Sequence, residues 1–260
     1  MPLQGYNMTG SHEGTFSQAH FDTAYPTGIE HHFWNLARNR ILAKALKNCA
    51  AQGPMLEIGC GTGVVVAGLR DMGFDCWGSD LGHSQAAAGA EKFLYLGQDC
   101  RTLDAGFRDS IRTLLILDVI EHVSDPVGFM TSIRESFPHA EKLLATVPAR
   151  KELWSNYDDN YGHLRRYDRT MLANEVLAAG FSLRDMHYFF HALYLPMRLL
   201  SKSGRSTEIQ APTGFKRIIH KLLAAFCVAE AALVPGYIAG TSIIAVADIR
   251  ANVARSAHGL

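Results

Sequence analysis

The sequence predicts an α/β protein built around a mostly parallel β-sheet. Between residues 55 and 147, short apolar segments alternate with segments of helical periodicity, which is the pattern of consecutive βαβ units. The strand at 114–117 is apolar at every position, as expected for a sheet that helices cover on both faces. The strand at 55–59 runs directly into a glycine-rich turn that opens a helix, as in sheets that bind ligands at their edge.

Hydrophobic periodicity predicts the elements before Pro148. A helix over 30–50 is expected because apolar side chains recur there at spacings of three and four residues. These side chains are Phe33, Leu36, Ala37, Ile41, Ala45 and Leu46. The remaining elements are expected to be strand 55–59, helix 62–71, strand 74–79, helix 83–91, strand 93–96, strand 113–118, helix 126–136 and strand 142–147.

The order of elements changes beyond Pro148. Glycine and proline mark the element ends in this half of the chain. The expected order is a loop at 150–168, a helix at 169–179, a strand at 181–190, a helical region at 192–236 broken by Pro196, Pro212 and Pro235, and a last strand at 241–248.

Composition and charge narrow the class of protein. The 260-residue chain is 48% hydrophobic and 19% charged, which is too apolar for intrinsic disorder. Its 25 basic and 25 acidic residues leave no basic excess, so we expect no nucleic-acid partner. We expect neither a membrane span nor a secretion signal, because no apolar run is long enough and the first residues are polar. Five widely spaced cysteines favour a reduced, cytoplasmic compartment.

The turn after the first strand carries the clearest chemical signal. Residues 57–63 read EIGCGTG, in which glycines let a ligand approach the main chain and the following helix offers unpaired N–H groups. A dinucleotide site would prefer G-x-G-x-x-G, whereas the spacing here is G-x-G-x-G and position 64 is valine. Glu57 also suits a ligand with an ammonium group better than one with a pyrophosphate. A nicotinamide dehydrogenase is therefore the less favoured alternative.

Together with three further strand ends, this loop resembles the class I S-adenosylmethionine-dependent methyltransferases. The string LEIGCGTG at 56–63 is similar to the first motif of that family. Asp80 ends the second strand, Asp99 follows the third, and the string DVIEH, which begins with Asp118, ends the fourth. The resemblance implies that Asp80 holds the ribose hydroxyls of S-adenosylmethionine and that Asp99 contacts the adenine amino group.

The resemblance covers about residues 30–190 with the strand at 241–248, and it implies a Rossmann-like, doubly wound fold. The sheet would be seven-stranded and mostly parallel, with an antiparallel last strand and helical cap insertions. The parts implied are an N-terminal arm and cofactor-covering helix at 1–50, an S-adenosylmethionine-binding core at 51–191, a helical cap or insertion at 192–240, and a last core strand and tail at 241–260.

Two stretches resemble a narrower group, the small-molecule methyltransferases of ubiquinone and menaquinone biosynthesis. They are GHLRRY at 162–167 and EHVSDP at 121–126. HFWNLARNR at 32–40 resembles the cofactor-covering helix of that group, which implies that Trp34 and Arg38 lie near the methionine end of the cofactor. The alternative is that Trp34 packs on the sheet and Arg38 is solvated. Altogether the resemblance implies a cofactor site made of Trp34, Arg38, Glu57, Gly59, Cys60, Gly61, Gly63, Asp80, Leu81, Asp99, Cys100, Asp118 and Val119.

Methyl transfer is an in-line displacement at a sulfonium carbon, so the protein mainly positions the reactants and supplies a base where one is needed. His122 is the first candidate for that base, because it follows the fourth-strand motif and an imidazole titrates near neutral pH. His163 and Tyr167 are further candidates, and the alternative is that His122 only orders its loop. The run 158–160 (Asp-Asp-Asn) offers ligand types, but adjacent residues rarely converge on one ion, so we expect no metal site.

The sequence thus predicts an enzyme that methylates a small organic acceptor, with oxygen as the preferred acceptor atom. Nitrogen, carbon, saccharide and lipid acceptors stay open, as does an inactive cofactor-binding protein. Residues 192–236 fit a substrate-covering cap, a basic amphipathic helix in peripheral contact with a membrane, or a packed helix pair. The sequence does not predict the oligomeric state.

Overall fold

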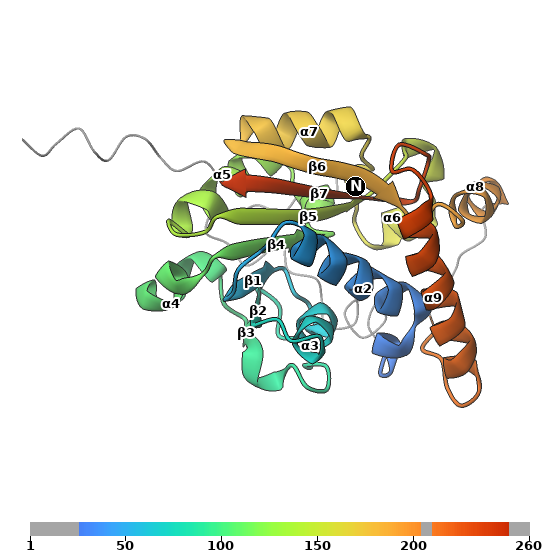
Figure 1. Ribbon diagram of the computed structural model, residues 1–260, viewed down its shortest axis with the longest axis horizontal. Coiled ribbons are helices and arrows are strands. Elements are labelled where there is room, and N and C mark those ends of the chain that lie inside the picture. Colours follow the sequence, from blue (N-terminus) through green and yellow to red (C-terminus); the bar gives the residue numbers. More distant parts are fainter. Residues whose placement is uncertain (1–25, 204–209, 250–260) are drawn as a thin grey trace, which may run out of the picture.

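One mixed β-sheet forms the centre of the computed structural model, which describes residues 26–203 and 210–249 (Figure 1). Its strands are β1 (Met55–Ile58), β2 (Cys76–Asp80), β3 (Leu94–Leu96), β4 (Thr113–Leu117), β5 (Lys142–Pro148), β6 (Phe181–Phe189) and β7 (Ser242–Ile249). They lie in the order β3-β2-β1-β4-β5-β7-β6, and β7 alone runs antiparallel to its neighbours β5 and β6. The predicted seven-stranded, mostly parallel sheet is confirmed. The outer parts of the predicted arm and tail lie outside the described residues.

Helices connect the strands and cover the sheet. They are α2 (Phe33–Asn48), α3 (Val64–Asp71), α4 (Ala105–Ser110), α5 (Pro126–Ser136), α6 (Asn156–Asn160), α7 (Arg169–Ala178), α8 (Tyr194–Ser203) and α9 (Lys216–Leu233). Short 3₁₀ turns are η1 (Ile29–His31), η2 (Glu91–Phe93), η3 (Cys100–Thr102), η4 (Ile120–His122) and η5 (Lys151–Leu153). The short helices α4 and α6 are absent from the sequence prediction.

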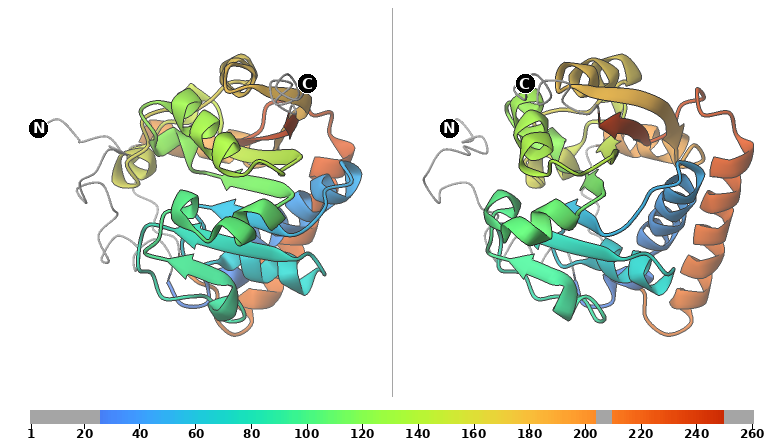
Figure 2. Two further views of the ribbon diagram at one scale, coloured as in Figure 1. Left: turned by 90° about the vertical axis from the view of Figure 1, so that its left-hand side faces the viewer. Right: turned by 60° about the vertical axis from the view of Figure 1, so that its left-hand side comes forward.

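Alternate residues of the central strands point to opposite faces of the sheet, and each face has its own core. Leu56 and Ile116 pack in one core with side chains of α5 and α7. Met55 and Leu115 pack in the other core with side chains of α2, α3 and α9. Figure 2 shows α2 and α9 lying together on one side of the sheet. Every residue of β4 is buried. This agrees with its composition, which is apolar from Leu114 to Leu117 and polar only at Thr113.

The predicted helix at 83–91 is wrong. Residues 83–87 are irregular, residues 88–90 form a turn, and Glu91 begins η2. The N–H of Ala87 donates to the carbonyl of Thr62 at 2.7 Å, and the hydroxyl of Ser84 donates to the carbonyl of Gly61 at 2.8 Å. These tertiary hydrogen bonds override the helical preference of the alanine-rich sequence.

The predicted helical region at 192–236 consists of α8 and α9. Pro212 and Pro235 lie outside both helices, as expected. Pro196 does not break a helix, because it stands in the first turn of α8, where a backbone N–H would have no intrahelical acceptor.

The chain reverses its direction of strand addition between β1 and β4, which lie side by side in parallel register. In doubly wound sheets, ligands bind beyond the carboxyl ends of the strands at this point. The loops after β1, β2 and β4 begin here with Gly59, Leu81 and Asp118. The topology therefore brings the residues that follow separate strands to a common edge of the sheet.

A histidine cap makes the stability of α2 depend on pH. Nδ1 of His32 accepts the N–H of Trp34 at 3.3 Å, and the ring centre of His32 lies 4.8 Å from that of His220 on α9. Burial and the neighbouring His220 lower the pKa of His32 from 6.5 to about 4. Between these values the unfolded chain binds more protons than the folded chain. The contribution of His32 to the free energy of unfolding therefore rises with pH over this window and is lost on acidification.

We expect His32→Asn to flatten part of that rise, because asparagine caps a helix without titrating. The expected difference is about 1 kcal/mol between about pH 4.5 and pH 7, allowing for the partial exposure of the ring. Urea unfolding at both pH values measures this difference. His139→Asn is the control, since His139 is exposed. An unchanged pH slope in His32→Asn would contradict the prediction.

Candidate active site

The turn between β1 and α3 has a backbone that favours glycine. Gly59, Gly61 and Gly63 have φ angles of +75°, +55° and +80°, in the left-handed region. A Cβ on Gly59 would lie 2.7 Å from Cγ2 of Val119, and a Cβ on Gly63 would lie 2.8 Å from Cδ1 of Leu94. The predicted glycine loop thus packs main chain closely against the β4 loop and β3.

Asp80 ties the end of β2 to this loop. Its Oδ2 accepts the N–H of Gly61 at 2.8 Å, and its Oδ1 accepts the N–H of Gly82 at 2.7 Å. Burial raises the pKa of Asp80, although these two hydrogen bonds lower it. A carboxylate has about four acceptor sites, so both oxygens retain capacity for ligand hydroxyls.

A pocket at this edge gathers many of the residues predicted to hold the cofactor. Its walls come from β1, the end of β2, the loops after β2, β3 and β4, and one face of α5. The lining residues are Ile58, Gly59, Ser79, Asp80, Leu81, Gln98, Asp99, Cys100, Val119, Phe129 and Ile133. The sequence prediction missed Ile58, Ser79 and Gln98, each next to a predicted residue, and also Phe129 and Ile133. The only signal for Phe129 and Ile133 was their spacing of four residues on a predicted helix.

Asp99 stands in this pocket with its charge already paired. Nε of Arg101 donates to both carboxylate oxygens, at 3.0 and 3.1 Å. Burial raises the pKa of Asp99, but the hydrogen bonds from Arg101 outweigh it, and the pKa lies below its usual value. The carboxylate is therefore ionised at neutral pH. The main-chain N–H, Nε and Nη2 of Arg101 together occupy most of its acceptor sites.

Arg38 of α2 lies against the residue that follows β4. Its Nη1 donates to Oδ2 of Asp118 at 2.6 Å, and its guanidinium carbon lies 4.2 Å from the ring centre of Trp34. The ring of Trp34 stacks on Phe190 at 5.9 Å. Arg38 is buried, so the alternative of a solvated arginine is wrong. The helix predicted to cover the cofactor thus contacts the end of β4.

Glu57 is a buried carboxyl group at the base of the glycine loop. Burial raises its pKa from 4.5 to about 8, although nearby Arg38 lowers it. Its Oε2 has no hydrogen-bond partner among the described residues. A buried acceptor without a donor is costly, and the ammonium group of S-adenosylmethionine would satisfy it. The residues present therefore fit that cofactor.

Three acid–base side chains meet directly beyond the β4 loop. Glu121 and His122 come from η4, His163 comes from the loop after α6, and their ligand atoms all lie within 4.8 Å of one another. Burial, aided by Asp118, raises the pKa of the fully buried Glu121 well above its usual value. Burial and the neighbouring His163 lower the pKa of His122 to about 4. His122 is therefore neutral at pH 7 and a weaker base than an exposed imidazole.

Backbone and side-chain hydrogen bonds bring His163 to this place, 41 residues after His122. The N–H of Leu164 donates to the carbonyl of Glu121 at 2.8 Å. Oδ1 of Asp158 lies 2.8 Å from Nδ1 of His163 and accepts Nε of Arg166 at 2.7 Å. Asp158, predicted only as part of an acidic run, thus orients His163.

Two predicted site residues turn inward. The prediction of Tyr167 as a base is wrong, because its side chain is fully buried and its hydroxyl donates to the carbonyl of Ile120 at 3.3 Å. Burial, with Glu175, raises the pKa of Tyr167 far above its usual value. The side chain of Cys60 is buried against Gly78, where an added Cβ would lie 2.7 Å from Sγ. Only the main chain of Cys60 faces the loop.

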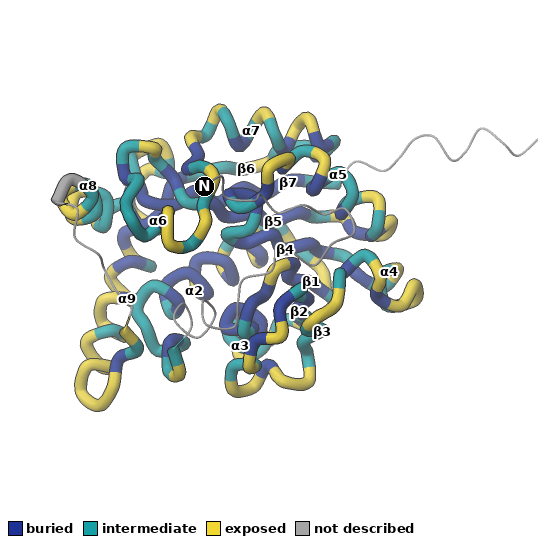
Figure 3. The backbone as a smooth tube through the Cα atoms, turned by 180° about the vertical axis from the view of Figure 1, so that it is seen from behind, coloured by how far each residue is buried: buried dark blue, intermediate teal, exposed yellow. Residues whose placement is uncertain are grey.

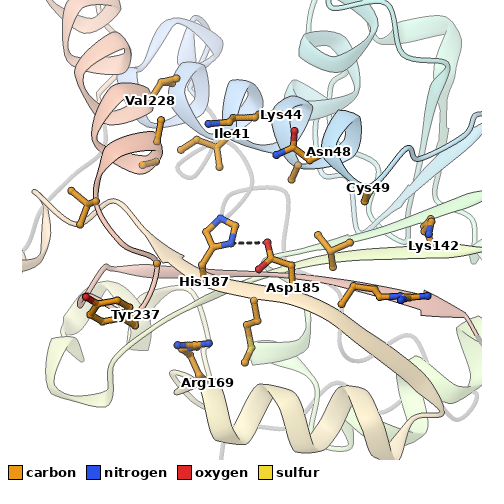
Figure 4. A pocket seen from close by; sticks show the side chains of 18 residues that line it. Ile41, Lys44, Asn48, Cys49, Lys142, Arg169, Asp185, His187, Val228 and Tyr237 are labelled. Atoms are coloured by element: carbon orange, nitrogen blue, oxygen red, sulfur yellow. Dashed lines mark hydrogen bonds and ion pairs between the residues drawn. The ribbon is translucent and has the colours of Figure 1, made fainter.

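A larger groove lies elsewhere, between α2, α9 and the strands β6 and β7 (Figure 4). Its volume is about 690 Å³, and its lining includes Lys44, Asn48 and Tyr237. Nδ1 of His187 and Oδ2 of Asp185 form a pair there at 3.0 Å. None of the residues predicted for the cofactor or for catalysis lines this groove.

A family comparison decides between the ligand classes that the glycine loop left open. The profile described as a methyltransferase domain matches residues 29–185. The chain belongs to the methyltransferase-domain family. It is an S-adenosylmethionine-dependent methyltransferase, and its sheet order is that of the class I fold predicted from the motifs.

The methyltransferase is similar in fold to solved structures of low sequence identity. One is phosphoethanolamine N-methyltransferase 2 of Haemonchus contortus in complex with S-adenosyl-L-methionine, with 16% identity over 91% of this chain and 60% of that chain and a TM-score of 0.53. Another is magnesium protoporphyrin IX methyltransferase of Synechocystis PCC 6803 with bound SAH, with 14% identity over 93% and 90% of the two chains and a TM-score of 0.48. No curated protein matches the methyltransferase in sequence.

The helices of the methyltransferase are too short or too polar to span a bilayer, as far as residues 26–203 and 210–249 are concerned. All five cysteines are free thiols.

Proposed function

We propose that the enzyme transfers the methyl group of S-adenosylmethionine to an oxygen atom of a small organic acceptor. The observation that carries this proposal is the cluster of Glu121, His122 and His163, which follows the β4 loop at the cofactor pocket. A hydroxyl group must lose its proton to become a strong nucleophile, and this cluster offers one carboxyl and two imidazoles for that step. An amine or carbon acceptor that is already nucleophilic would not need them.

In this proposal the two ends of the cofactor are held by different elements. The pocket of Asp80 and Asp99 takes the ribose and adenine, and Glu57 takes the ammonium group. Arg38 and Trp34 of α2 cover the methionine end. The methyl group then points toward Asp118 and the cluster, and the enzyme acts mainly by aligning the acceptor oxygen behind the S–CH₃ bond.

Calorimetric titration with S-adenosylmethionine, followed by methyl transfer to matched panels of hydroxyl, amine and carbon acceptors, tests the proposal. The expected result is saturable binding and transfer to hydroxyl compounds. Transfer confined to amines or carbon acids would replace oxygen as the acceptor atom. Cofactor binding with no transfer to any panel would instead support an inactive cofactor-binding protein.

Asp80→Asn is expected to weaken S-adenosylmethionine binding by tenfold or more. A charge-assisted hydrogen bond is worth about 1.5–3 kcal/mol, and the amide keeps only one oxygen acceptor. The dissociation constant from calorimetry measures the effect, with thermal unfolding to verify the fold. Asp75→Asn is the matched control, because this exposed aspartate pairs with Arg70 at 3.0 Å and does not line the pocket. An unchanged constant in Asp80→Asn would remove the ribose assignment.

We also infer that α9 and α8 rest on an anionic membrane surface on the cytoplasmic side. Much of the backbone of α9 belongs to exposed residues (Figure 3). Its large exposed apolar side chains follow one another as a stripe, at spacings of three and four residues along most of the helix. They are Phe215, Ile218, Ile219, Leu222, Leu223, Phe226 and Leu233, and α8 adds Leu195 and Leu199. Exposed Lys216, Arg217 and Lys221 flank the stripe, while the sole acidic residue of α9, Glu230, is buried. Apolar and basic groups together fit an anionic lipid surface.

Co-sedimentation with vesicles of phosphatidylglycerol and phosphatidylcholine tests this surface. We expect the double variant Leu222→Ser/Phe226→Ser to bind vesicles at least tenfold more weakly. Burying each of these apolar side chains in lipid contributes about 1.5–3 kcal/mol to the binding free energy. Leu177→Ser is the matched control, because Leu177 is 48% exposed on α7. Concentration-dependent dimers that form without vesicle binding would show that the stripe joins two copies of the chain instead.

A further inference from the structure

We propose that Glu121, His122 and His163 form a binding site for a divalent transition-metal ion. Their ligand atoms lie within 4.8 Å of one another, which is close enough for one ion to contact all three. Two imidazoles and one carboxylate are a donor set that first-row ions such as Mn²⁺, Co²⁺ and Zn²⁺ accept. Three protein ligands also leave coordination positions for water or substrate. The role of this site in catalysis rests on the oxygen methylation proposed above.

Glu121 gives the first observation that points to a ligand. Its side chain is fully buried, and neither Oε1 nor Oε2 has a hydrogen-bond partner among the described residues. The nearby arginines are paired with other carboxylates, Arg38 with Asp118 and Arg166 with Asp158. Burying a carboxylate without a hydrogen-bond donor or a cation beside it costs much free energy. A bound metal ion would supply the missing positive charge and a direct ligand contact to the carboxylate.

The histidines give the second observation, because both rings are oriented through the same nitrogen. Nδ1 of His163 lies 2.8 Å from Oδ1 of Asp158, and Nδ1 of His122 lies 3.4 Å from the carbonyl of Gly162. Metal-binding histidines usually donate one ring N–H to a carboxylate or carbonyl in this way. Nε2 is then the nitrogen that would bind the ion in each ring. Glu121 is buried and the side chain of His163 is only 8% exposed, whereas His122 is partly exposed.

The position of the site gives it a role in the reaction. It begins two residues after Val119, which lines the cofactor pocket. A hydroxyl group bound to the ion would lose its proton to solvent more readily, since a divalent ion lowers the pKa of a coordinated oxygen. The oxygen lone pair then forms the new O–CH₃ bond while the S–CH₃ bond breaks. The electron pair of the broken S–CH₃ bond stays on sulfur. The products are S-adenosylhomocysteine and the methyl ether of the acceptor. This site differs from the acidic run 158–160 and from the sequence-based expectation of no metal.

Titration of the chelator-treated full chain with Mn²⁺, without cofactor or acceptor, tests the site directly. Electron paramagnetic resonance measures the free Mn²⁺, and thermal unfolding measures the stabilisation. We expect one saturable ion per chain and a rise in Tm of roughly 5 °C or more at about 100 times the dissociation constant. Glu121→Gln and His163→Gln should each weaken binding by at least about tenfold, the loss found even for outer partners of a metal site.

His187→Gln is the matched control, because it removes a histidine paired with Asp185 in the separate groove of Figure 4. We expect this variant to bind Mn²⁺ like the wild type. Glu121→Gln is expected to fold, because the buried carboxyl group that it removes has no hydrogen-bond partner in the described part of the chain. His163→Gln carries the test independently. Absence of saturable binding in the wild type, or equal binding in all variants, would overturn the proposal.

The test separates the metal site from the proposed reaction. Oxygen methylation that survives complete removal of metal would reject the role of the ion and leave the proposed function intact. Mn²⁺ binding that depends on Glu121 and His163, in a protein that methylates no hydroxyl, would support the site and reject the proposed function.

Discussion

Gly61→Val is expected to abolish S-adenosylmethionine binding, with an affinity loss of at least about 100-fold. Gly61 has a φ of +55°, which a β-branched residue adopts only at a cost of about 1–3 kcal/mol. Its N–H also holds the carboxylate of Asp80 at 2.8 Å, so a shift of the loop moves both groups. Calorimetric titration measures the loss.

The matched control for this variant is Gly73→Val. Gly73 has a φ of +87°, but an added Cβ there would meet no atom of the described residues within 4 Å. This control therefore introduces backbone strain outside the site and should lower the Tm while leaving cofactor affinity within about twofold. If Gly61→Val folds and binds the cofactor normally, the loop after β1 is not the cofactor site.

His122→Ala is expected to lower turnover by about 10²–10⁴-fold while changing cofactor affinity little. The reason holds whether the imidazole takes the proton itself or helps to hold an ion that acidifies the acceptor. In both cases the ring acts on the acceptor and does not line the pocket assigned to the ribose and adenine. Single-turnover rates with saturating cofactor, together with the dissociation constant, measure the two effects separately.

His187→Ala serves as the control for His122→Ala, because it deletes a histidine outside the site. It should keep wild-type turnover. Retained turnover in His122→Ala would mean that alignment of the reactants is sufficient or that His163 removes the proton. A loss of cofactor affinity in His122→Ala would instead place the imidazole beside the cofactor.

Much of the fold was predictable from the sequence because its signals are local. Short apolar runs in the sequence predict the strands β1 and β4. The closely spaced glycines of the loop after β1 predict a turn with positive φ angles, which the structure has. The residues at the ends of successive parallel strands then meet at one edge for topological reasons. The pocket that contains Gly59, Asp80, Asp99 and Val119 is the result, although these residues span 61 positions.

The errors in the prediction arise where distant contacts compete with local preference. Residues 83–91 have the composition of a helix, yet the segment makes hydrogen bonds to the glycine loop and is irregular over residues 83–87. Tyr167 has the chemistry of a base, yet packing places it in the core. The stripe of α9 has the same spacing as a buried face, and no local pattern reveals that it is exposed.

The sequence by itself determined the sheet, the glycine loop and the family, because each depends on the type and spacing of residues close in the chain. Only the tertiary structure decided that His163 meets His122 and that the buried Glu121 has no hydrogen-bond donor within residues 26–203 and 210–249. That arrangement depends on Asp158 and Leu164, whose hydrogen bonds fasten one loop to another. Contacts of this kind depend on how whole elements pack, and they cannot be predicted from the spacing of residues in the sequence.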